Sequence, residues 1–90
     1  MKSEVLRELL AEVGPATVDA GRLTFSERDE VTLLVAAHGT SLAVEGVCSA
    51  SVRSGYVVAE AADGETYFLC LDQLVGLKVR RGKREGPGFR

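Results

Sequence analysis

The chain has 90 residues, of which 46% are hydrophobic and 27% are charged, and its formal net charge is −2. This length allows one small domain, which buries only about 60–65% of the surface that its unfolded chain exposes and gains stability from association with further copies. No apolar stretch reaches the roughly 20 residues of a membrane span, and the first residues resemble no secretory signal, so we expect a soluble, cytoplasmic protein without membrane partners.

The charge is distributed unevenly along the chain. Residues 78–90 carry six basic side chains and one acidic side chain, a net charge of +5, which leaves −7 for residues 1–77. A basic tail of this kind can bind nucleic acid through phosphate contacts, fold back onto the acidic body, or keep the protein soluble. All three alternatives stay open at this point.

The first expected element is a helix that begins at the N-cap Ser3 and ends at the Gly14-Pro15 pair. Its apolar residues recur at helical spacing and form one stripe: Val5, Leu6, Leu9, Leu10 and Val13. The pattern predicts an amphipathic helix with one face on a core. The next stretch, residues 15–30, mixes turn formers with apolar pairs. It predicts only one short strand, whose first apolar residues are Leu23 and Phe25.

Five strands are expected after this stretch, because β-branched and apolar runs alternate there with turn signals. They span residues 31–37, 42–52, 56–61, 66–71 and 75–79. Turns are expected at His38-Gly39, Ser54-Gly55 and Asp63-Gly64, and Gly46 predicts a bend or bulge inside the second strand. Residues 71–74 are too few for an α-helix and predict a single 3₁₀-like turn.

The fourth strand lacks the apolar and polar alternation of a strand with one wet face. Tyr67, Leu69 and Leu71 share one face, whereas Phe68 and Cys70 share the other. One set should therefore fill the core, and the other should meet the helix or another copy of the chain.

Together these elements predict a mainly β fold with one N-terminal helix. Turns at intervals of roughly 8–12 residues favour a five-stranded, strongly bent antiparallel barrel of the SH3-like kind over an open sheet. We expect one domain over residues 1–79 and a basic, disordered tail over residues 80–90.

The order of elements resembles the Sm-like fold shared by the bacterial RNA chaperone Hfq and by Sm and Lsm proteins. The resemblance covers residues 31–79 and rests on the runs "VTLLVAAHGTSL" and "YFLCLDQLVGLKV". It implies an oligomer in which the fourth strand of one copy pairs with the fifth strand of the next. The family's RNA pocket is not implied, because Cys70, Leu71 and Asp72 stand where Hfq-type chains carry a Tyr-Lys-His run, and the Arg-Gly pair of Sm proteins is missing there.

Two functions follow as alternatives. The first is nonspecific binding of RNA or other nucleic acid through basic residues near the C-terminus: Lys78, Arg80, Arg81, Lys83 and Arg84. The second is a homo-oligomeric interaction or scaffold module that contacts protein partners without binding nucleic acid. In both, the expected oligomer interface lies on the last two strands: Tyr67, Leu69, Leu71, Val75 and Leu77.

An enzyme is not expected. His38 is the only histidine and lies in a turn signal, and Cys48 and Cys70 lie in apolar strands without metal-ligand spacing. A thiol in such a strand usually behaves as a small hydrophobe, so we expect no catalytic residue, metal or cofactor. Tyr56 and Tyr67 are able to stack on bases, but packing is the favoured role for both.

Overall fold

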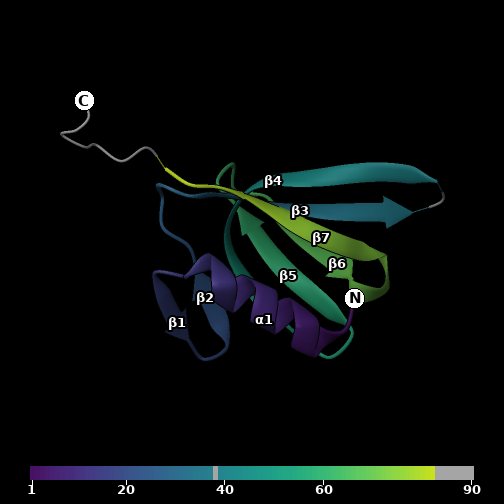
Figure 1. Ribbon diagram of the computed structural model, residues 1–90, viewed down its shortest axis with the longest axis horizontal. Helices are drawn as coiled ribbons and strands as arrows, with labels where there is room; N and C mark the ends of the chain where they lie inside the picture. The colour runs from purple at the N-terminus through teal and green to yellow at the C-terminus, as the bar shows by residue number, and fades with distance from the viewer. Residues whose placement is uncertain (38, 83–90) are drawn as a thin grey trace.

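In the part of the chain that the structure describes, one N-terminal helix is followed by seven antiparallel strands (Figure 1). The mainly β fold is as predicted, but these strands form one open sheet and do not close into the expected barrel. The structure is a computed structural model, and it describes residues 1–37 and 39–82. The elements are α1 (Ser3–Val13), β1 (Thr17–Asp19), β2 (Arg22–Thr24), β3 (Glu30–Ala37), β4 (Thr40–Val52), β5 (Tyr56–Ala61), β6 (Thr66–Cys70), the 3₁₀ turn η1 (Leu71–Gln73) and β7 (Leu74–Arg80). Its described helices are all too short or too polar to cross a bilayer.

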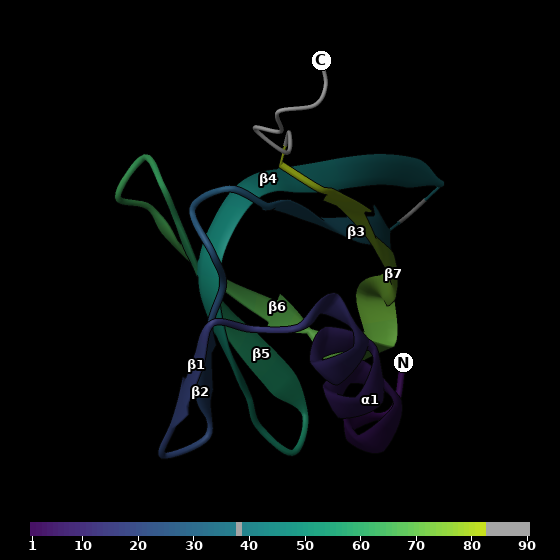
Figure 2. The same cartoon turned by 60° about the vertical axis from the view of Figure 1, so that its left-hand side comes forward.

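Strand β4 organises the sheet. It is 13 residues long, and its first part pairs with β3 while its second part lies between β2 and β5. Gly46 has a φ of 69°, and the register with β3 shifts there, as expected for a bulge that bends a strand. Figure 2 shows the resulting curve of β4, with α1 on the concave side of the sheet. The predicted bend at Gly46 is thus confirmed.

Besides the five later strands, the sequence predicts one short strand near Leu23 and Phe25, and the structure has β2 there and also β1, so residues 15–30 form a hairpin. β1 pairs with β2, and Leu23 of β2 lies opposite Ala50 of β4. The hairpin turns at Ala20 and Gly21, whose φ angles of 52° and 82° are both left-handed. Such a two-residue turn usually carries Asn or Gly at its first position, so the Ala20-Gly21 pair does not indicate a hairpin in the sequence. The five predicted strands all occur, and β7 extends by one residue at each end, to Leu74 and Arg80. Arg80 is therefore a strand residue and not the start of a disordered tail, and residues 83–90 of the predicted tail lie outside the described residues.

The helix covers the core as predicted, but its N-terminus differs. Leu6 and Leu10 are fully buried, whereas Val5 is 43% exposed. The N-cap is Lys2, with no side-chain hydrogen bond, and Ser3 is already helical, so the N-cap prediction for Ser3 is wrong. The Met1 amino group instead donates to the carbonyl oxygen of Leu71 at 2.6 Å, which ties the start of the chain to η1.

The core fills the concave side of the sheet beneath the helix. Its buried side chains come from α1, from β3, β4, β5 and β7, from η1, and from the loop after β2: Leu6, Leu10, Val13, Phe25, Val31, Leu33, Val35, Val44, Val47, Ala50, Val52, Val57, Ala59, Leu71 and Leu74. Tyr67 and Leu69 are half-buried against this core. Phe68, on the opposite face of β6, is 70% exposed. The inner face of β6 therefore packs inside the molecule, and α1 does not cover its outer face.

We expect Leu10→Ala to lower the free energy of unfolding by about 2–5 kcal/mol, because it removes a fully buried side chain at the helix–sheet contact. Val5→Ala on the same helix is the matched control and should change it by less than about 0.5 kcal/mol. Urea unfolding followed by circular dichroism measures both. Equal effects of the two changes would contradict the helix packing described above.

Candidate functional site

Three strands have an open edge in the described part of the sheet. β1, which pairs only with β2, is three residues long, whereas β6 and β7 are five and seven residues long. Within the described residues, β6 pairs only with β5, and β7 pairs only with β3. The Leu71 amide donates to the Gly55 carbonyl (3.1 Å), and the Ala61 amide donates to the Glu65 carbonyl (2.9 Å). These two bonds show which residues of β6 direct their backbone groups toward β5 and which direct them away. Backbone groups of Thr66, Phe68 and Cys70 consequently point to the open edge. This edge is a template for a further strand.

An aromatic pair lies beside the β6 edge on the outer face of the sheet. The rings of Phe68 and Tyr56 have centroids 6.5 Å apart and are tilted by 37°. Phe68 is 70% exposed and Tyr56 is 43% exposed. Tyr67, by contrast, packs against the core. The outer face of β5 and β6 thus presents apolar surface next to free backbone groups.

A shallow apolar groove lies next to β7. Its volume is about 290 Å³, and its lining comes from β3, β4 and β7: Leu34, Val35, Ser41, Leu42, Ala43 and Val75. Leu42 and Val75 are 61% and 63% exposed. The open edges of β6 and β7 therefore both have uncovered apolar side chains near them, and Val18 on β1 is exposed as well.

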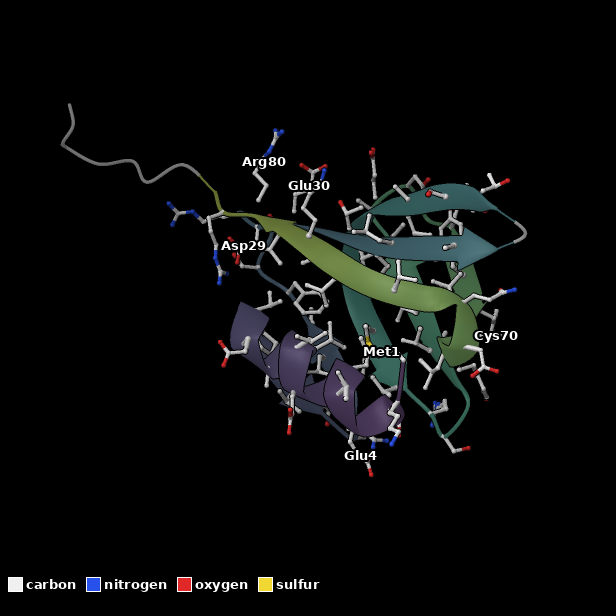
Figure 3. All side chains as sticks on the ribbon, turned by 45° about the vertical axis from the view of Figure 1, so that its right-hand side comes forward. Met1, Glu4, Asp29, Glu30, Cys70 and Arg80 are labelled. Atoms are coloured by element: carbon white, nitrogen blue, oxygen red, sulfur yellow. The ribbon has the colours of Figure 1, made fainter. Side chains whose placement is uncertain are left out.

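The two edges carry opposite charges. Asp63 and Glu65 are exposed in the turn that leads into β6, where the Asp63 carboxylate accepts the Glu65 amide at 2.9 Å. Lys78 and Arg80 are exposed near the end of β7. Arg80 lies directly opposite Glu30 of β3, and Figure 3 shows these two side chains together at the end of the sheet.

The predicted nucleic-acid residues divide into three groups. Lys78 and Arg80 belong to β7 and are exposed. Arg81 is engaged with the body, because its Nη1 donates to the Val13 carbonyl at 2.7 Å and to the Asp29 carboxylate at 3.2 Å. Lys83 and Arg84 lie outside the described residues.

The predicted interface residues also have different positions. Leu71 is a core residue with 3% exposure, so its side chain does not reach the surface. Tyr67, Leu69 and Leu77 are half-buried against the core. Val75 alone of this set is well exposed. Sequence reasoning missed Phe68 as the exposed aromatic at the edge, although the alternation along β6 does place it opposite Tyr67 and Leu69.

Other candidate groups form no second site in the described part of the chain. No three of its histidine, cysteine and acidic side chains lie close enough together to hold a metal ion. Cys48 and Cys70 are free, exposed thiols, and His38 lies outside the described residues. Ser49, which is 2% exposed, lies under an ion pair between Arg22 and Glu60 and hydrogen-bonds to both. This network connects β2, β4 and β5, which is a structural role.

The end of β7 is held by the same contacts that engage Arg81. The Gly82 amide donates to the other Asp29 carboxylate oxygen at 3.3 Å. A Cβ atom added at Gly82 would lie 2.2 Å from the carbonyl oxygen of Arg28, so only glycine fits against this backbone. The contacts of Arg81 and Gly82 with Asp29 and Val13 form a C-terminal clamp.

We expect Gly82→Ala to destabilise the protein by about 1 kcal/mol, because the added Cβ displaces the chain and breaks the C-terminal clamp. Gly55→Ala is the control, since a Cβ there has no neighbour within 4 Å, and it should be within about 0.5 kcal/mol of the starting protein. Chemical denaturation measures the difference. If both variants unfold at the same denaturant concentration, the clamp contributes nothing to stability.

Comparisons of the chain with protein-family models, with curated proteins and with solved structures find no match. The strand edges, their charges and their exposed side chains are therefore the basis for a functional proposal.

Proposed function

We propose that the protein is a non-enzymatic, self-associating module in which the β6 edge of one copy pairs with the β7 edge of the next. The observation that carries this proposal is the opposite charge at the two longer open edges of the described sheet, β6 and β7. Because the two edges differ, the contact is head-to-tail, and repetition of it closes a ring or extends a filament. A small domain also gains buried surface in this way.

The charges favour antiparallel pairing of the two edges. In that direction the start of β6, with Asp63 and Glu65, lies near the end of the neighbouring β7, with Lys78 and Arg80. In the parallel direction the same carboxylates lie near Asp72, which precedes β7 and is exposed. Complementary charges of this kind favour one orientation and steer association.

The order of strands supports a finer description of the fold. Five strands follow one another across the sheet in the order β7, β3, β4, β5, β6, with the sharply bent β4 in the middle. A one-turn link, η1, separates the two outermost strands in the sequence. We propose an Sm-like, SH3-like barrel whose gap between β6 and β7 is filled by neighbouring copies.

A second candidate function is nonspecific nucleic-acid binding. It is favoured by Lys78 and Arg80, which lie two residues apart on the same face of β7 and are both exposed. Two cations on one strand face are able to contact successive phosphates. The acidic Glu30 opposite Arg80 and the engagement of Arg81 weigh against this function as the main one. The same two cations serve both proposals, so RNA and a neighbouring copy would compete for them.

The assembly proposal is tested by charge reversal. We expect Glu65→Lys and Lys78→Glu each to weaken self-association about fivefold, which corresponds to about 1 kcal/mol, and the double variant to restore it. Sedimentation velocity over a range of protein concentrations measures the association. Asp19→Lys on β1, an open strand that takes no part in the proposed contact, is the control and should have no effect. If the unmodified protein stays monomeric at every concentration, the proposal is overturned.

The nucleic-acid proposal is tested by fluorescence anisotropy of a short labelled single-stranded RNA. The Lys78→Gln, Arg80→Gln double variant should bind more weakly and lose about 0.7 units of salt dependence for each phosphate contact removed. Arg53→Gln, at an exposed position before β5, is the control. Absence of binding by the unmodified protein at low salt would exclude this function.

A further inference from the structure

A second, larger groove lies at the opposite end of the molecule from α1's N-terminus. Its volume is about 700 Å³, and it is bounded by the loop after β2, the bulged part of β4, the turn after β5 and the end of β7. Its exposed lining is mainly apolar. Ala62 is exposed there, whereas Phe25 and Val47 lie beneath the surface with 5% and 3% exposure. Cys48 also lines it, and its thiol is exposed.

The described chain ends at the wall of this groove. Arg80, Arg81 and Gly82 all line it, and the C-terminal clamp fixes where the chain leaves the body. Eight residues follow, with the sequence KREGPGFR. The groove is therefore next to the starting point of a segment that contains one aromatic residue, Phe89.

We propose that residues 83–90 fold back into this groove of the same chain and place Phe89 on its apolar lining. Phe89 lies seven positions after Gly82, and at roughly 3.4 Å per position the chain reaches up to roughly 24 Å, which is ample for an adjacent groove. Proline followed by glycine at Pro87 and Gly88 is typical of a type II turn, which reverses the chain. The proposal goes beyond self-association and does not depend on it.

Tethering, rather than charge, favours this occupant. The lining of the groove carries three acidic and three basic side chains, Glu27, Asp29, Glu30, Arg28, Arg80 and Arg81, so its charge does not select a basic segment. Because the tail is tethered at Gly82, its effective concentration at the groove is in the millimolar range for a short flexible linker, so weak contacts suffice to fill the site. The tail would then be a ligand of its own chain.

The test measures the reactivity of the Cys48 thiol. In the full chain carrying Cys70→Ser, we compare Phe89 with Phe89→Ser and Phe89→Leu, and we follow alkylation by iodoacetamide, a neutral reagent that does not respond to the charge of the tail. We expect Phe89→Ser to raise the alkylation rate of Cys48 at least threefold and Phe89→Leu to leave it near the starting value, because leucine retains an apolar side chain.

Cys70 supplies the matched control. In chains carrying Cys48→Ser, the alkylation rate of Cys70 should be the same with Phe89 and with Phe89→Ser, since Cys70 does not line the groove. Equal Cys48 rates in all tail variants would overturn the proposal. Protection of Cys48 that increases with protein concentration would overturn the same-chain assignment and assign the tail of a second copy to the groove.

Discussion

The bend of β4 at Gly46 is the constraint on which the rest of the structure depends. A straight strand of this length would carry β3 and β5 in one flat layer and leave the apolar residues of both facing water. The glycine adopts a left-handed φ, and the bulge turns the second part of β4 so that β5 and β6 curve under β3 and β7. The helix can then close the concave side with Leu6 and Leu10. A core for a chain of this size is obtained with one short helix and one sheet.

The same curvature leaves β6 and β7 with open edges in the described sheet, and open edges readily pair with other strands. Charged residues near each edge oppose random pairing, because a β6 edge meets like charges at another β6 edge. Exposed apolar side chains such as Phe68 and Val75 favour association, because a partner strand would bury them. The combination is selective: it disfavours unspecific stacking and favours one unlike pair of edges.

Much of the fold follows from the sequence, because strand alternation and turn chemistry act over short distances. The strands from Val31 onward, the turn at Asp63-Gly64 and the one-turn link after β6 are all where the sequence predicts them. The hairpin of β1 and β2 was not predictable, since Ala20 lacks the residue type that its φ requires. The candidate functional site is harder to predict from the sequence. The contact of Arg81 with Val13 joins positions 68 residues apart, and no local pattern reports such a contact.

The position of β4 also has a consequence for the order in which the molecule opens. Residues 49–51 are held from both sides, by β2 and by β5, whereas β1, β6 and β7 each have a single neighbour in the described sheet. Local opening begins where few hydrogen bonds and contacts must be broken at once. Amide protons at the outer strands should therefore exchange with solvent first, and those in the second part of β4 only when the whole domain unfolds. β6 and β7, whose edges we propose for association, are thus among the strands that open first, and pairing with a neighbouring copy would slow this local opening.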